Sequence, residues 1–165
     1  FNAHTKEEKE NLFMYLRSLI LQIPKKEFCG SFLKMFSKYS IDLFTKTRDL
    51  SMSWEQIISM SKSSFCTIAG HSVSHPDFKL LSEKEIENEI IESKNIIEQH
   101  IGKPVNHFAY PFGSFDENMF EFIDKISFKT VTTTENDIIR LKHRKRLHSL
   151  PRKMLTELKN ENFTH

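Results

Sequence analysis

Two histidines in this sequence have the residue type and spacing to bind a metal ion. His71 and His75 lie four residues apart in the run Gly70-His71-Ser72-Val73-Ser74-His75-Pro76. Neutral imidazole is a good ligand for a divalent ion such as Zn²⁺, and both rings reach one ion when the backbone between them makes a single turn. A chain with eight histidines often contains such a pair by chance. On spacing alone, metal binding and a surface or capping role both stay open.

A second candidate is the run Tyr110-Pro111-Phe112-Gly113. Proline fixes the backbone and glycine permits a tight turn, so this run predicts a sharp loop. One interpretation is a loop closed only by aromatic packing. The functional interpretation is that the backbone N–H of Phe112 faces a metal pocket and helps to bind an oxyanion.

The third candidate is His148, which follows a basic run at residues 142–146. We interpret most of that charge as a solvated loop. His148 itself lies between apolar positions in a segment that can form a strand. It is therefore either a buried structural histidine or a catalytic acid.

The elements that must position these residues differ between the two parts of the chain. Residues 1–50 have a helical pattern: Thr5 can cap a helix that continues to Ile23, and Pro24 ends it. A second helical segment is expected to carry the apolar residues Phe28, Phe32, Leu33, Phe36, Leu43 and Phe44.

From Leu50 onward, strand and helix signals alternate. Strands are expected at residues 65–69, 105–110 and 128–133, and helices are expected after Ser53, from Ser82 to Gly102, and at residues 117–126. This order is typical of parallel βαβ units. Ligands bind at the carboxyl ends of parallel strands, which is where both the histidine pair and the Tyr110–Gly113 run would lie.

Length and composition limit the class of protein. The chain has 165 residues, a net charge of +2, 38% hydrophobic and 28% charged residues, which predicts one globular domain or a large piece of one. The charge is too balanced to indicate nucleic-acid binding, and no apolar run is long enough to span a membrane. Cys29 and Cys66 are expected to be buried thiols. Because the chain starts at Phe1, we expect it to be a processed or excised piece.

In their order along the chain, these segments resemble the polysaccharide deacetylase family, with its NodB homology domain. The resemblance runs from about Leu50 to Arg152 and centres on the metal motif, here His-Ser-Val-Ser-His. The other runs that carry it are residues 52–56, 65–69, 101–105, 108–113, 127–133 and 150–152.

The resemblance implies an α/β fold, a deformed (β/α) barrel incomplete at its N-terminal side. The chain would be a single partial domain, with a helical segment at 1–50 and the barrel portion at 51–155. It implies a metal-dependent hydrolase, with Zn as the expected ion, that removes N-acetyl groups from a cell-envelope polysaccharide or glycan precursor. His71 and His75 would be metal ligands and His148 a catalytic residue. Phe112 would supply an oxyanion N–H and, with Tyr110 and Pro111, contact substrate.

Two departures from the family pattern leave a second, non-catalytic function open. The family's first motif is an adjacent Asp-Asp pair that supplies the base and the third metal ligand, whereas no two of the six aspartates here are adjacent. That motif would belong upstream of residue 1. In the third motif, Ala109 stands where many members have arginine. The alternative is a non-catalytic carbohydrate-binding or scaffold domain with a degenerate deacetylase fold. A zinc-stabilised structural domain is disfavoured, since neither cysteine is spaced to join His71.

The sequence leaves other properties open. Sugar specificity, the native metal and the oligomeric state cannot be inferred from it. The compartment also stays open between the cytoplasm and the cell envelope.

Overall fold

A computed structural model describes residues 3–23, 27, 30, 34, 42–115 and 119–153. The chain divides into two compact units, Phe1–Ser51 and Met52–His165. Each unit is described by itself.

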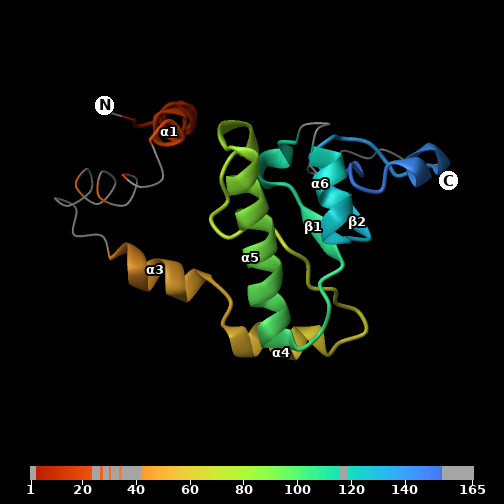
Figure 1. The fold of residues 1–165 in the computed structure, drawn as a ribbon. Coiled ribbons are helices and arrows are strands. Elements are labelled where there is room, and N and C mark those ends of the chain that lie inside the picture. Colours follow the sequence, from red (N-terminus) through yellow and green to blue (C-terminus); the bar gives the residue numbers. More distant parts are fainter. Residues whose placement is uncertain are drawn as a thin grey trace, which may run out of the picture. The chain divides into compact units, whose positions relative to one another are not determined.

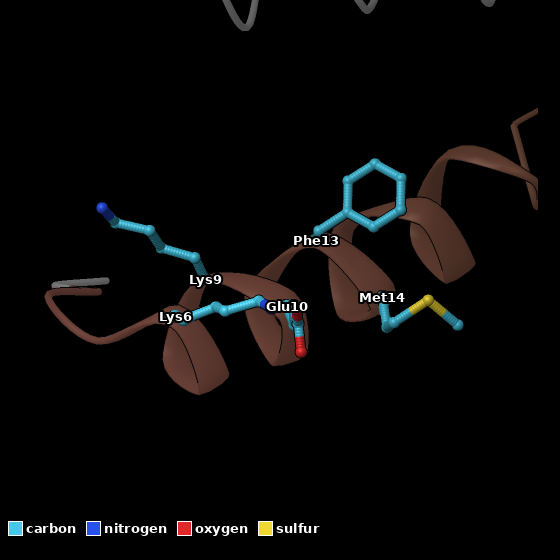
Figure 2. A pocket seen from close by; sticks show the side chains of 5 residues that line it. All are labelled: Lys6, Lys9, Glu10, Phe13 and Met14. Carbon is cyan, nitrogen blue, oxygen red and sulfur yellow. Dashed lines mark ion pairs between the residues drawn. The ribbon is translucent and has the colours of Figure 1, made fainter. Parts of the chain in front are cut away.

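The first unit contains helix α1 (Lys6–Ile20) and helix α3 (Leu43–Leu50). Thr5 caps α1 as predicted, in a reciprocal box with Glu8, and the helix ends at Ile20, before Pro24. The apolar residues Phe28, Phe32, Leu33 and Phe36 lie outside the described residues. Figure 2 shows five α1 side chains around an open hollow: Lys6, Lys9, Glu10, Phe13 and Met14. The Lys6–Glu10 pair there is 3.8 Å apart and highly exposed, so it adds little stability.

The second unit is built around parallel strands, as the sequence pattern predicts (Figure 1). Strand β1 (His107–Ala109) pairs with β2 (Thr130–Thr132), with His107 opposite Thr130 and Ala109 opposite Thr132. Single parallel bridges extend this arrangement, from Gly70 to Phe108 on one side and from Thr132 to Leu150 on the other. The carboxyl ends of all these segments therefore face one edge.

The prediction of a strand at residues 65–69 is wrong. Only the following residue, Gly70, bridges to β1. The run begins inside a turn instead, where the Phe65 and Cys66 amides bond back to Ser63. The Phe65 side chain is 99% exposed, so the apolar run does not form the buried strand that its composition suggested.

The helices of this unit agree with their predicted caps. Helix α4 (Trp54–Ser61) begins at the capping box of Ser53, and α5 (Glu83–Ile101) begins at that of Ser82. Gly102 ends α5 in the left-handed conformation, at φ 64°. Helix α6 (Met119–Ile126) and the short 3₁₀ turns η2 (Phe78–Leu80), η3 (Pro111–Gly113) and η4 (Leu141–Lys145) complete the unit. None of the described helices is long and apolar enough to cross a membrane.

The core lies between the paired strands and helices α5 and α6. Phe108 is its centre, with ring centroids 5.5 Å from Phe128 and 5.9 Å from Tyr110. The buried apolar residues of this core are Phe78, Ile86, Ile90, Val105, Phe108, Tyr110, Ile123, Phe128 and Val131. Each large side chain buried there stabilises the fold by roughly 1.5–3 kcal/mol. The aromatic cluster fixes the end of β1, from which the Tyr110 loop emerges.

Candidate active site

Three loops meet at the carboxyl edge of the parallel strands. The first holds His71 and His75, directly after the bridging residue Gly70. The second is the 3₁₀ turn η3 after β1, and its Phe112 carbonyl accepts a hydrogen bond from Thr134 Oγ1 at 3.2 Å. Thr134 belongs to the third loop, which follows β2. The strands thus bring together loops that are far apart in the sequence.

The tautomer of His71 is set by the backbone of the neighbouring strand. His71 Nδ1 lies 2.7 Å from the carbonyl oxygen of Ala109. Because a carbonyl can only accept, Nδ1 carries the proton in the neutral ring, and Nε2 keeps an unprotonated lone pair. Metal-ligating histidines usually donate their second nitrogen in this way. The exposed ring of His71 therefore offers Nε2 to a ligand.

His75 lies beside His71, as the spacing predicted. The two ring centroids are 4.7 Å apart at an interplanar angle of 73°. The loop between them is sharply turned, because Ser72 and His75 both have left-handed φ angles, 67° and 53°. The His75 amide closes the turn by donating to Ser72 Oγ at 2.9 Å.

Phe112 contacts His75 through its ring. Its centroid lies 4.6 Å from that of His75, edge to face. Its backbone is also left-handed, at φ 56°, which is a strained conformation for a non-glycine residue. The structure therefore places Phe112 next to the histidine pair, while its role in binding an oxyanion stays a prediction.

Tyr110 and Pro111, the other expected substrate contacts, are buried. The Tyr110 hydroxyl donates to the carbonyl oxygen of His148 at 3.2 Å, and its ring stacks on Phe115 with centroids 5.4 Å apart. In this structure both residues support the loop from the core side. A contact with substrate stays a prediction for them.

His148 lies toward the opposite end of the strands. Its Nε2 is 2.9 Å from the Phe128 carbonyl oxygen, and its Nδ1 is 2.7 Å from Asp124 Oδ1. Phe128 precedes β2, whereas the Ala109 carbonyl that holds His71 lies at the end of β1. These two carbonyls therefore lie toward opposite ends of the paired strands. His148 thus links α6 to the start of β2, and a catalytic role for it stays a prediction.

Sequence reasoning missed one residue of the site, Glu89 on α5. Its carboxylate accepts hydrogen bonds from the loop between the two histidines. A signal was present in the sequence, because Glu89 lies among Ile86, Ile90 and Ser93 on the buried face of the helix. A carboxylate on such a face needs polar partners.

The chemistry of the donors fits part of a metal site. A catalytic zinc site usually has three protein ligands and an open position. His71 and His75 supply two imidazoles, and within the described residues no group of three or more His, Cys, Asp or Glu side chains could hold an ion. Asp77 is engaged elsewhere, since its Oδ1 accepts from Ser114 Oγ at 2.6 Å and from the Lys79 amide at 3.0 Å.

Comparison with known proteins gives the family. The sequence profile described as "Polysaccharide deacetylase" matches residues 22–131, which is more than half of the chain. The chain therefore belongs to the polysaccharide deacetylase family. The match begins before Leu50, where the motif resemblance begins. A comparison with curated proteins found no significant match.

Several solved deacetylase structures are similar to the chain. The deacetylase PplD of Streptococcus pyogenes, solved in complex with acetate, is 22% identical with a TM-score of 0.58, over 62% of this chain and 44% of that chain. A polysaccharide deacetylase from Bacillus cereus is 27% identical (TM-score 0.55), over 62% of this chain and 32% of that chain. IcaB from Ammonifex degensii is 25% identical (TM-score 0.55), over 64% of this chain and 48% of that chain.

The chain thus spans less than half the length of each of these structures. These neighbours imply the (β/α) barrel fold of the NodB type. Within the described residues, the chain contributes a two-stranded parallel sheet with one bridge on each side.

Proposed function

We propose that this chain is part of a metal-dependent hydrolase that removes N-acetyl groups from a cell-envelope polysaccharide or glycan precursor. One observation carries the proposal. In a member of the polysaccharide deacetylase family, His71 and His75 lie side by side, and the Ala109 carbonyl fixes the tautomer of His71. The chain is similar to solved deacetylases and covers less than half of each of them. This similarity supports a barrel to which the chain contributes one part.

Each residue at the strand edge has a role in this proposal. His71 Nε2 and the His75 ring hold a divalent ion, most readily Zn²⁺, and the ion when bound supplies Lewis-acid chemistry at the acetyl carbonyl. In this proposal, the Phe112 backbone N–H donates to the carbonyl oxygen as negative charge develops there. The Phe112 ring, packed against His75, limits the movement of both residues.

Two roles have to come from outside the described residues. The family's Asp-Asp motif supplies a third metal ligand and a general base, and the sequence contains no adjacent aspartates. A longer protein that also carries this Asp-Asp motif is therefore the form to assay.

The test is acetate release from N-acetylated oligosaccharides by that longer protein, with Zn²⁺ or Co²⁺ added. We expect turnover that His71→Ala removes, while His4→Ala, which alters an exposed histidine far from the strand edge in sequence, leaves it unchanged. No acetate release with any divalent metal would contradict the proposal.

The second candidate is a non-catalytic carbohydrate-binding or scaffold domain. It is favoured by the lack of a three-residue ligand group among the described parts of the chain. Equilibrium binding of the same oligosaccharides separates the two candidates. A scaffold binds them without releasing acetate and keeps its affinity in His71→Ala, whereas an enzyme loses turnover in that variant.

A further inference from the structure

The loop between His71 and His75 is held from behind by a single buried carboxylate. Glu89 Oε2 accepts from the Val73 amide at 2.9 Å and from the Ser74 amide at 2.8 Å. Its Oε1 accepts from Ser74 Oγ at 2.6 Å. Glu89 is only 7% exposed. One buried side chain thus accepts three hydrogen bonds, two of them from consecutive loop amides, so this cluster is a firm anchor.

The loop needs such an anchor because its backbone is strained. Ser72 and His75 both adopt left-handed φ angles, and each costs on the order of 1–2 kcal/mol for a residue with a Cβ. The conformation persists only where the surroundings enforce it. The Glu89 hydrogen bonds fall on Val73 and Ser74, which lie between the two strained residues.

Helix α5 packs closely against Gly70, the residue that leads into the loop. A Cβ added to Gly70 would lie 3.6 Å from Ser93 Oγ and 2.9 Å from the Phe108 ring, so α5 and β1 approach Gly70 closely. Glu89 lies one turn before Ser93 on the same helix. The Glu89 carboxylate is thus carried on a helix that already packs closely against Gly70.

We propose that Glu89 is a positioning residue that makes His71 and His75 converge on one metal ion. This inference rests on the proposed function, since it assigns the metal to these two histidines. Glu89 acts through the loop backbone and does not itself ligate the ion. Partners that orient metal ligands typically change metal affinity about 10–100-fold when they are lost.

The test separates the effect of side-chain length from the effect of charge at position 89. Glu89→Gln keeps the length and a carbonyl oxygen that accepts from both amides, whereas Glu89→Asp keeps the charge but is one methylene shorter. Glu92→Ala is the matched control, because it removes an exposed carboxylate from the same helix. Two quantities are measured on the longer protein that carries the Asp-Asp motif: hydrogen exchange of the Val73 and Ser74 amides without metal, and Zn²⁺ affinity by calorimetry.

We expect Glu89→Asp to speed exchange at both amides at least about tenfold and to weaken Zn²⁺ binding about 10–100-fold. Glu89→Gln should restore protection and most of the affinity, and Glu92→Ala should match the wild type. Protection of the α5 amides reports whether each variant is folded. Since Asp is a small change, it keeps the test usable even if Glu89→Ala fails to fold.

The inference is overturned if folded Glu89→Asp keeps wild-type exchange or wild-type affinity, or if Glu89→Gln is no better than Glu89→Asp. His71→Ala distinguishes this failure from that of the proposed function. If His71→Ala binds Zn²⁺ as tightly as the wild type, the metal assignment fails, and with it the inference that Glu89 serves that site.

Discussion

A backbone carbonyl decides which nitrogen of His71 faces outward. Ala109 O accepts from His71 Nδ1, so the ring presents Nε2 at the edge where His75 and Phe112 also lie. The sequence predicted the histidine pair from residue type and spacing. It could not predict the tautomer, because the partner is a main-chain atom 38 residues away. Nor could it show that the Asp77 carboxylate is engaged with Ser114.

Tyr110 gives a test at the residue scale that needs no metal. Burial raises the pKa of its hydroxyl well above the ordinary value of 10.0, and the negative charge of Asp124 adds to the effect. In the unfolded chain the hydroxyl ionises above about pH 10, while in the folded protein it stays protonated. Its contribution to stability is therefore complete below pH 10 and is lost as the pH rises from there toward the folded pKa, by up to about 1.4 kcal/mol per pH unit.

The variant for this test is Tyr110→Phe, measured by urea unfolding at several pH values. At pH 7 the variant should be about 1 kcal/mol less stable, because the His148 carbonyl loses its hydrogen bond. Phenylalanine does not titrate, so the difference between variant and wild type should shrink above pH 10. A difference that stays constant from pH 7 to pH 11 would show that the hydroxyl is not held protonated by burial.

At the scale of secondary-structure elements, caps and turns determine where the helices and loops begin and end. Thr5 as a cap, and the capping-box patterns at Ser53 and Ser82, each predicted a helix start that the structure confirms. Such local signals work because the partners lie within one turn. The run at 65–69 failed as a predicted strand because a turn at Ser63 takes its first residues. The extent of pairing depends on distant segments, which a local pattern does not contain.

Two left-handed glycines offer a matched pair of variants. Gly113, at φ 67° in the Phe112 loop, has Thr134 atoms 2.0–2.7 Å from where a Cβ would lie, including the Thr134 backbone nitrogen at 2.5 Å. Gly102, at φ 64° after α5, has nothing within 4 Å of that position. Both substitutions to alanine pay the same conformational cost, roughly 1–2 kcal/mol, but only Gly113→Ala adds a steric clash.

We therefore expect Gly102→Ala to lower the free energy of unfolding by about 1 kcal/mol and Gly113→Ala by about 3 kcal/mol or more. The extra loss arises because the β2 loop must move away from the Phe112 loop. Denaturant unfolding of both variants measures it. Equal losses in the two variants would mean that the Thr134 contact is not as close as the structure has it.

At the scale of the whole molecule, the family and the parallel α/β fold were predictable and the extent of the barrel was not. Alternating strand and helix signals predicted a parallel α/β arrangement, which the pairing of β1 with β2 confirms, although the strand expected at residues 65–69 did not form. The share of the relatives' length that the chain covers cannot be inferred from periodicity. Because the chain covers less than half of these relatives, we do not expect its residues alone to supply all the metal ligands.

The measurement that tests the metal assignment most directly is calorimetric titration of this 165-residue chain with Zn²⁺. With two imidazoles and no third ligand among the described residues, binding should be weak. His71→Ala and His75→Ala should each abolish it, while His4→Ala should leave it unchanged. Tight binding that survives His71→Ala would place the metal elsewhere and contradict the account.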